Sequence, residues 1–390
     1  MTTSNCAASH IELTTYDEEK MCEAVEACRE RLGENPDCVF CFVSSDWKRH
    51  VGDLVEVIQV HGRAKLVVGC SADGLIGIGE ENESVSGISM LFLSLPGTKV
   101  RCCSIEEGDV GEGVTSDYWH RVTGVKGDEE GDWIVLGNPA LLSPEKWLMS
   151  WNASYPRSKT FGGLASGGGE EDLFLFSTAG VSEPAALAVH FGGGVRLQGV
   201  VSQGCRPIGE PYTITSVDDN YVVEIASQRA FDVLEEAFNS LEAEEQAGAR
   251  GNIFAGIAMS EYREEYGRGD FLVRNIIGGD PDAGVLALGA FPRVGQTLQF
   301  QLRDKDTADE DLRHACEEAQ REHGEPFGML LFSCTGRGVR MFGVPNHDAG
   351  VVEDVFGKVS LAGFFCNGEI APVGNQNFLH GYTAAGVMFC

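Results

Sequence analysis

Hydrophobic residues recur along the chain with two spacings, one typical of helices and the other of buried strands. Apolar residues spaced three or four apart in residues 17–32 predict a helix that Thr14 or Thr15 begins and Gly33 ends. Short continuous apolar runs predict buried strands at 38–43, 65–70 and 88–95. The first part of the chain therefore alternates helices with strands.

Residues 38–95 form a unit of strand, helix, strand, turn and strand. Its helix is indicated by an apolar face of Trp47, Val51, Leu54, Val55 and Ile58. A similar unit is predicted in residues 328–390, because Gly69, Gly74 and Gly87 are spaced identically to Gly363, Gly368 and Gly381. Glycines at repeated positions mark places where a side chain would not fit. The spacing thus predicts a duplicated β-turn-β unit.

A third, less regular copy is predicted in residues 133–191. A strand at 133–137 precedes a helix that begins at Ser143-Pro144, and a glycine-rich turn at 161–169 precedes strands at 173–176 and 185–191. Residues 101–132 are predicted to be a loop with an irregular edge strand, and residues 71–79 are predicted to be a turn.

The second half of the chain is predicted to begin between Gly199 and Gly209. It contains a helix from Ser227, strands at 253–259, 271–277, 285–291 and 298–302, and a helix with a capping box at 307–310 that Gly324 ends. We predict an α/β fold of mixed β-sheets flanked by helices, with two pseudo-symmetric halves built from duplicated β-turn-β units. The domains are expected at 1–203 and 204–390.

Composition narrows the class of partner and the compartment. The formal net charge of −30 and the absence of a long Lys/Arg cluster argue against nucleic acid and against an anionic membrane surface. The first residues lack a secretory apolar segment, and no apolar run is long enough for a membrane helix. We therefore expect a cytoplasmic protein with reduced cysteines, and we interpret Cys38 and Cys41 as strand residues rather than a metal site.

Several ordered motifs together resemble the FIST family, in which a FIST N-terminal and a FIST C-terminal domain occur together. The resemblance spans nearly the whole chain, and it is carried by Gly-Cys-Ser-Ala-Asp-Gly at 69–74, Phe-Gly-Gly-Leu-Ala-Ser-Gly at 161–167, Gly-Cys-Arg-Pro-Ile-Gly at 204–209, Phe-Leu-Val-Arg-Asn-Ile at 271–276, Cys-Thr-Gly-Arg-Gly at 334–338, 363–369 and His-Gly-Tyr-Thr at 380–383. It implies a sensory module that binds small ligands such as amino acids, with residues 1–203 as the FIST N-like and 204–390 as the FIST C-like domain. In F-box members of the family it implies a substrate receptor, but no F-box-like segment stands in this sequence.

No familiar catalytic or metal signature is present. Residues 69–74 match neither the G-x-S-x-G elbow nor a phosphate-binding loop, and the histidines lack metal-ligand spacing. We therefore expect no catalytic residue, no metal and no cofactor.

Polar residues follow two strands that are predicted to be neighbours, as α/β ligand sites require. Cys334 and Arg337 follow one strand, and Asn367 and Glu369 follow the other. An Arg fork and a carboxylate suit a zwitterion, with Arg337 on the ligand carboxylate and Glu369 on its amine. The alternative is that Arg337 and Glu369 pair with each other and only staple the turn.

Four further residues complete the predicted ligand site. His380 and Tyr382 are expected on one face at the start of the last strand, where they line a pocket or cap the core. Ser71 lies in the first glycine turn, where an Asp73 turn is the structural alternative. Arg206 follows a strand, and pairing with Asp304 or Asp280 is its alternative role.

The sequence favours a non-catalytic sensory module that binds a small polar ligand such as an amino acid. One alternative is a protein-interaction module that works as a substrate receptor with a separate ubiquitin-ligase or signalling partner. The other is an enzyme that uses Cys334, whose thiol an adjacent cation such as Arg337 would activate.

Overall fold

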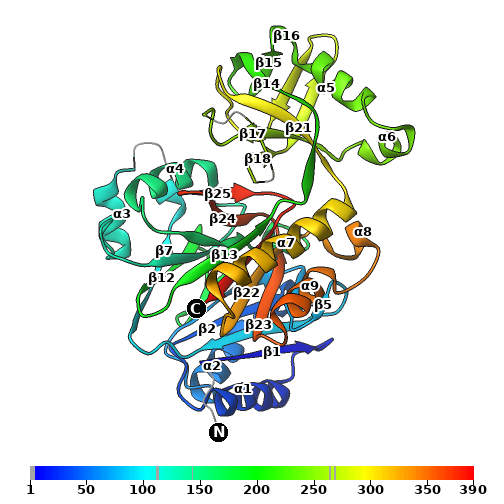
Figure 1. The fold of residues 1–390 in the computed structure, drawn as a ribbon. Helices are drawn as coiled ribbons and strands as arrows, with labels where there is room; N and C mark the ends of the chain where they lie inside the picture. The colour runs from blue at the N-terminus through cyan, green and yellow to red at the C-terminus, as the bar shows by residue number, and fades with distance from the viewer. Residues whose placement is uncertain (1–4, 111–113, 143, 263–264, 268) are drawn as a thin grey trace. The chain divides into compact units, whose positions relative to one another are not determined.

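The computed structural model describes residues 1–390 apart from 1–4, 111–113, 143, 263–264 and 268 (Figure 1). The chain forms two compact units, one of residues 1–202 with 312–390 and one of residues 203–311. Both contain helices and sheets, and the sheets of the first unit are mixed, which confirms the predicted α/β class. The predicted domain division at 203/204 stays a prediction, since these units are defined by packing and the first resumes at Leu312.

The first unit holds three sheets of six strands each. The first sheet has the order β1 (Cys6–Glu12), β6 (Gly87–Leu93), β2 (Cys38–Ser44), β3 (Val67–Ala72), β10 (Leu175–Ser177), β11 (Gly180–Ser182). The second has the order β25 (Gln376–His380), β24 (Glu369–Val373), β9 (Thr160–Leu164), β8 (Asp132–Gly137), β12 (Ala186–Gly193), β7 (Thr98–Ile105). The third has the order β13 (Leu197–Ser202), β26 (Ala384–Phe389), β22 (Gly328–Cys334), β23 (Leu361–Cys366), β4 (Gly74–Gly77), β5 (Glu80–Asn82).

The three sheets share one strand plan. In each, a parallel pair (β2 with β3, β8 with β9, β22 with β23) is flanked by an antiparallel strand and an edge strand. On the other side of each parallel pair lies a hairpin. In the sequence, this hairpin is found between two strands that belong to a different sheet. The hairpin β4–β5 pairs with β23, β10–β11 with β3, and β24–β25 with β9. Each sheet is therefore completed by strands from another part of the chain.

One glycine in each parallel pair occupies the same place. A Cβ atom on Gly69, Gly162 or Gly363 would lie 1.9, 1.8 or 2.0 Å from the carbonyl oxygen of the residue opposite it on the neighbouring strand. Only glycine fits where two backbones approach so closely. The third glycine of the predicted duplication does not correspond. Val43 and Ser333 occupy equivalent positions in the two sheets, and they lie opposite Ile88 and Ala384 respectively. Gly87 therefore matches Thr383 and not Gly381, and the duplication itself stays a prediction.

Helices cover the outer faces of the three sheets. They are α1 (Glu18–Leu32), α2 (Val51–Val60), α3 (Ser116–Thr123), α4 (Pro144–Ser154), α7 (Lys305–His323), α8 (Gly338–Phe342) and α9 (His347–Phe356), with 3-10 helices at Ser45–His50, Glu107–Val110 and Glu170–Asp172. The inner faces share one core, in which Phe42 packs on Phe332 and Phe364 from another sheet. Strands buried on both faces explain the continuous apolar runs in the sequence.

Several sequence predictions of local structure were wrong in detail. Asp17, not Thr14 or Thr15, caps α1 by accepting from the Lys20 N–H, whereas Gly33 ends the helix in the left-handed region as predicted. Asp304 caps α7 through the Thr307 N–H, so no capping box begins at Thr307. Residues 101–132, predicted to be a loop with an irregular edge strand, do contain part of the edge strand β7, but they also contain the helix α3, which was not predicted. The turn at 71–79 contains β4, and Ser143 lies outside the described residues.

The second unit is built around a sheet of short antiparallel strands. They are β14 (Cys205–Asp218), β15 (Tyr221–Ile225), β16 (Gln228–Arg229), β17 (Ile253–Ala258), β18 (Phe271–Arg274), β19 (Ile276–Asp280), β20 (Val285–Leu288) and β21 (Thr297–Arg303), accompanied by α5 (Ala230–Asn239) and α6 (Ala243–Ala249). Its own core includes Ile214, Val233, Leu286 and Phe300. In the chain, this unit interrupts the connection between β13 and α7.

Candidate functional site

The turns that follow β3, β9 and β23 meet and form a ring of hydrogen bonds. The Ser166 N–H donates to the Ser71 carbonyl oxygen at 3.2 Å, and the Asn367 N–H donates to the Leu164 carbonyl oxygen at 3.0 Å. The Asp73 N–H donates to Ser166 Oγ at 2.8 Å, and that hydroxyl donates to the carbonyl oxygen of Phe365 near the end of β23. Three glycine turns far apart in the sequence thus form one continuous rim.

The side chains at this rim differ in exposure. Asp73 and Asn367 are exposed, and the Asn367 amide donates to the Ala165 carbonyl oxygen at 3.1 Å. Ser71, a predicted ligand residue, is buried, and its hydroxyl accepts from the Phe174 N–H at 3.2 Å. Ser71 belongs to β3 and not to the predicted turn, and its side chain links β3 to the residue before β10, which is a structural role.

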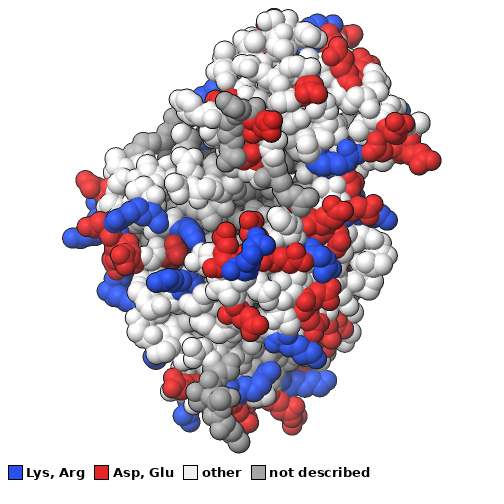
Figure 2. All heavy atoms as spheres, viewed as in Figure 1, with Lys and Arg blue, Asp and Glu red and all other residues white. Residues whose placement is uncertain are grey.

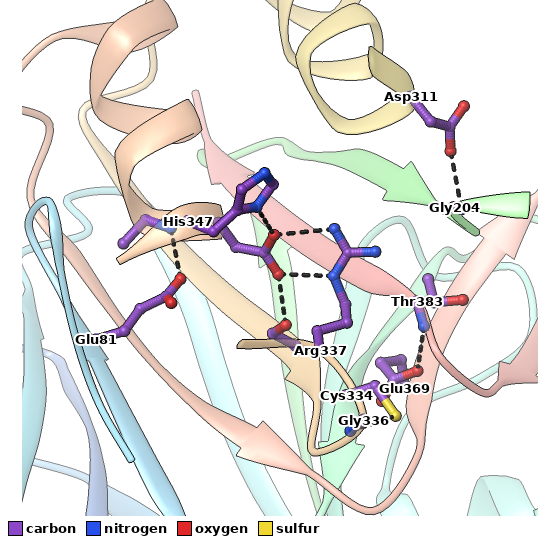
Figure 3. A network of polar contacts seen from close by, with 12 residues as sticks. Glu81, Gly204, Asp311, Cys334, Gly336, Arg337, His347, Glu369 and Thr383 are labelled. Atoms are coloured by element: carbon purple, nitrogen blue, oxygen red, sulfur yellow. Dashed lines mark hydrogen bonds and ion pairs between the residues drawn. The ribbon is translucent and has the colours of Figure 1, made fainter. Parts of the chain in front are cut away.

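Arg337 lies wholly buried below the rim and forms a two-pronged ion pair with Asp348 (Figure 3). Its Nε donates to Oδ2 at 2.7 Å and its Nη2 donates to Oδ1 at 2.9 Å. Asp348 is thus the carboxylate that fills the Arg337 fork, and the alternative staple between Arg337 and Glu369 is wrong. The guanidinium also lies 5.2 Å from the centre of the Phe342 ring.

Two further residues hold the Asp348 carboxylate in place. The Ser333 hydroxyl donates to Oδ2 at 2.7 Å, and the His347 Nδ1 lies 2.8 Å from Oδ1 (Figure 3). Burial alone would raise the pKa of Asp348, but the Arg337 charge and the hydrogen bonds from His347, Arg337 and Ser333 hold that pKa well below its usual range. The pair is therefore ionised at neutral pH.

The hairpin β4–β5 and the residues after it close this side of the site. Glu81 accepts from the Ala349 N–H at 2.8 Å, and its own N–H donates to Asn346 Oδ1 at 2.7 Å. Glu83 accepts from the Val339 N–H at 2.8 Å. Burial, followed by the nearby Asp348 charge, raises the pKa of Glu81 to about 8. Glu81 is therefore mostly protonated at neutral pH.

Glu369 is wholly buried between two thiols. It accepts from the Thr383 N–H at 3.1 Å, and the Cys366 thiol donates to it at 3.2 Å (Figure 3). Burial raises the pKa of Glu369 to about 8, although hydrogen bonds and the charge of Arg337 act against the rise. At neutral pH its carboxyl group is mostly neutral, so it would not form an ion pair with a ligand amine there.

Cys334 lies in the same cluster, and its thiol accepts from the Gly336 N–H at 3.4 Å. Burial, helped by the charge of Glu369, raises the pKa of Cys334 to about 12. Since the thiolate is the nucleophile, this environment argues against the cysteine enzyme considered above.

His380 and Tyr382 have different roles. His380 lies at the end of β25, not in the last strand, and its Nε2 is 3.1 Å from the Ala371 carbonyl oxygen within the hairpin. Tyr382 is half-buried in the turn before β26 and has a φ of 59°. A bulky residue in this region is strained, and such residues are found most often at functional sites.

Arg206, the remaining predicted site residue, belongs to the second unit. It pairs with Asp304 at 3.0 Å and with Glu245. Pairing with Asp304 was the structural alternative, and the structure confirms that contact.

The structure thus brings together most of the predicted site. Cys334, Arg337, Glu369 and Tyr382 share one cluster, and Asn367 and Ser71 reach it through the ring of turns. Sequence reasoning missed Asp348, Ser333, Glu81 and Ser166. Asp348 had a signal, since it is in line with Val351, Val352 and Val355, the apolar face of its helix.

Neither metal ligation nor membrane crossing has support in the part of the chain that the structure describes. No group of three or more His, Cys, Asp or Glu residues there is arranged to hold a metal ion. No helix of the described residues is long and apolar enough to cross a membrane. On the face that Figure 2 shows, Lys and Arg are interspersed with Asp and Glu.

The domain composition is decided by comparison with protein families. The FIST N domain matches residues 37–228 and the FIST C domain matches residues 230–372. The chain belongs to the FIST family. FIST domains are associated with sensing in signal transduction.

Relatives cover nearly the whole chain. Protein Rv0628c of Mycobacterium tuberculosis, described as uncharacterized, is 34% identical over 94% of this chain and 95% of its own length. Mb0898c of Mycobacterium bovis, also described as uncharacterized, is 32% identical over 94% of each chain. F-box/LRR-repeat protein At5g63520 of Arabidopsis thaliana is 28% identical over 29% of this chain and 25% of its own length.

One solved structure covers nearly all of the chain at low similarity. Cyanuric acid hydrolase from A. caulinodans covers 98% of this chain and 99% of its own, at 10% identity and a TM-score of 0.28. A TM-score this low carries no argument about fold or activity.

Proposed function

We propose that this FIST protein is a sensory module that binds a small polar molecule, such as an amino acid, at the rim of the three glycine turns. The observation that carries the proposal is the set of hydrogen bonds that joins these turns at the ends of β3, β9 and β23. Ligand sites of α/β sheets form at the ends of parallel strands, which is where this ring lies.

The structure changes the roles expected of the charged residues. Asp348 fills the Arg337 fork, so Arg337 contributes a fixed positive charge below the rim rather than free donors for a ligand carboxylate. Glu369 is mostly neutral at pH 7 and offers a hydrogen bond instead of a counter-ion for an amine. Direct contact with a ligand is assigned to Asn367 and Tyr382, which are exposed and half-buried.

The test is a thermal-shift screen of the twenty amino acids on the full chain, together with native mass spectrometry of gently purified protein. We expect at least one amino acid to raise the melting temperature and to appear as a bound mass. Asn367→Ala and Tyr382→Phe should abolish the shift while the unliganded melting temperature stays within about 2 °C of the wild type. Asn375→Ala, at an exposed hairpin position, is the matched control and should keep the shift.

Arg337→Ala is a poor test of this function, because it leaves Asp348 as an uncompensated buried charge. The absence of both a shift and a bound small molecule would contradict the proposal. So would an unchanged shift in both rim variants.

A second candidate is a protein-interaction module, which the similarity to an F-box/LRR-repeat protein favours. The second unit also exposes large apolar side chains, with Tyr262 at 98%, Ile277 at 62% and Phe291 at 61% exposure. Affinity purification that recovers one stoichiometric partner, with no amino-acid shift, would favour this candidate.

A further inference from the structure

Two cysteines stand opposite each other where the site begins. Cys334 and Cys366 are the last residues of β22 and β23, and they are direct partners in the parallel register. Neighbouring strands lie about 4.8 Å apart, and partners in register point to the same face. A disulfide requires Cα atoms about 4.4–6.8 Å apart, so the backbone spacing suits one.

Both thiols contact the same carboxyl group. The Cys366 thiol donates to Glu369 Oε1 at 3.2 Å, and Cys334 is a second hydrogen-bond partner of Glu369. The two sulfur atoms are therefore gathered around one group that can accept a proton. In the corresponding position of the first sheet, Ser44 stands opposite Ala72. The strand plan alone therefore does not require a pair of thiols.

We propose that Cys334 and Cys366 form a reversible disulfide when a hydroperoxide reaches the end of β22. This adds oxidation as a second input to the module and does not depend on the identity of the ligand at the rim. Cys334 is 8% exposed and Cys366 is fully buried, so Cys334 is the residue that the peroxide meets first.

The reaction balances with hydrogen peroxide as the oxidant. Glu369, in its ionised form, accepts the Cys334 proton, and the thiolate attacks one peroxide oxygen and breaks the O–O bond to give a sulfenic acid. Glu369 passes the proton to the departing hydroxide, which leaves as water. The Cys366 sulfur then attacks the Cys334 sulfur, and the hydroxyl group leaves as a second water. The two thiols lose two electrons and two protons, and the peroxide takes up both.

Burial affects the rate of this reaction more than its outcome. It raises the pKa of both thiols, which makes thiolate scarce and the first step slow. The disulfide itself is uncharged, so a buried site does not disfavour it. Once formed, it would join the turn that carries Arg337 to the turn that carries Asn367, which fixes the rim.

The experiment treats the full chain with hydrogen peroxide, alkylates the remaining thiols and maps the peptides by mass spectrometry. We expect a linked peptide pair that contains Cys334 and Cys366, is lighter by two hydrogen atoms and disappears after dithiothreitol. In Cys366→Ser, Cys334 should stop at a sulfenic acid that dimedone traps. Cys70→Ser removes a buried thiol from β3 and should leave the link intact.

Three results would overturn the proposal. In the first, the thiols of Cys334 and Cys366 stay free while other cysteines react. In the second, Cys334 is linked to a different cysteine, and in the third, Cys334 is oxidised to a sulfinic acid without forming any link. If Cys366→Ser does not fold, the peptide map of the wild type and of Cys70→Ser still decides.

Discussion

Arg337 and Asp348 form a buried ion pair in which two guanidinium nitrogens meet the two carboxylate oxygens at 2.7 and 2.9 Å. Both side chains are almost fully excluded from water, at 0% and 1% exposure. A buried charge that loses its partner is strongly destabilising, whereas a buried pair replaced as a unit costs little.

Removing one member of this pair should therefore destabilise the first unit. We expect Arg337→Met and Asp348→Leu each to lower the free energy of unfolding by about 3–5 kcal/mol. The double variant Arg337→Met with Asp348→Leu should recover most of that loss. Urea denaturation of the four proteins measures the coupling, and additive losses would show that the two residues act independently.

The stability of the protein should fall as the pH rises from about 6.5 to 8. Glu369 and Glu81 have folded-state pKa values of about 8, above that of an unfolded glutamate, so the folded state holds protons that the unfolded state has lost. Each group contributes stability that is complete below the unfolded pKa and is lost as the pH rises through the folded pKa. The slope is at most about 1.4 kcal/mol per pH unit per group.

The pH window is chosen to separate these carboxyl groups from histidines. Burial lowers the pKa of His190 to about 4, and it also lowers the pKa of His10. These two histidines therefore raise the stability of the protein as the pH rises from their folded pKa to about 6.5, and not above it. Above that pH the glutamates lower the stability, and the cysteines add to the fall toward pH 8, because burial raises the pKa of thiols such as Cys334 and Cys366 above the unfolded value. The comparison of each Gln variant with the wild type therefore isolates the carboxyl contribution. Melting temperatures of Glu369→Gln and Glu81→Gln should fall less steeply than wild type, and parallel curves would contradict the assignment.

The second unit should be removable. Each sheet of the first unit has an edge strand that leads into a helix. Residues 13–17 join β1 to α1, and residues 106–115 join β7 to α3. The equivalent connection, from β13 to α7, contains the second unit. Replacing residues 203–303 by about ten Gly and Ser residues should leave the first unit folded, because it has its own core and keeps the Asp304 cap. Cooperative thermal unfolding by circular dichroism is the measurement.

The separate fragment 203–311 is the complementary control for this deletion. It contains its own core and should also unfold cooperatively. Loss of cooperative unfolding in the deletion variant, with a folded fragment, would show that the first unit needs the insertion.

Glycine at position 363 should be far less replaceable than glycine at position 350. An alanine Cβ at Gly363 meets the Leu331 carbonyl oxygen, so Gly363→Ala should cost about 3 kcal/mol or more. Gly350 lies within α9 with open space around it, and Gly350→Ala should stabilise by about 0.5–1 kcal/mol. Urea denaturation measures both, and equal effects would refute the close-approach argument.

Much of the fold follows from the sequence because buried strands carry their signal locally. The run that became β2 is apolar on both faces, and the predicted strand at 38–43 corresponds to the observed Cys38–Ser44. The strand β5, with Glu80 and Glu81 in its three residues, carries no such signal. It forms because β4 pairs with β23, a partner that local patterns do not reveal.

The candidate site was predictable in place but not in pairing. Strand ends and glycine turns located Cys334, Arg337, Asn367 and Glu369. Asp348, the partner of Arg337, was missed because it lies in the first turn of α9, ahead of the valines and Phe356 that mark the apolar face of this helix. Tyr382 was expected in a regular strand, but its left-handed backbone depends on the turn that leads from β25 into β26.

The exchange of hairpins among the three sheets has a consequence for how the chain acquires its structure. The strand β4 is made early, yet its partner β23 is among the last segments to leave the ribosome. The second and third sheets cannot be completed before the chain is nearly finished, whereas the strands of the first sheet end at Ser182. This order predicts slow folding dominated by distant contacts. During that interval the hairpin β4–β5 and the edge of β9 lack their partner strands, and a chaperone that shields them would raise the yield of native protein.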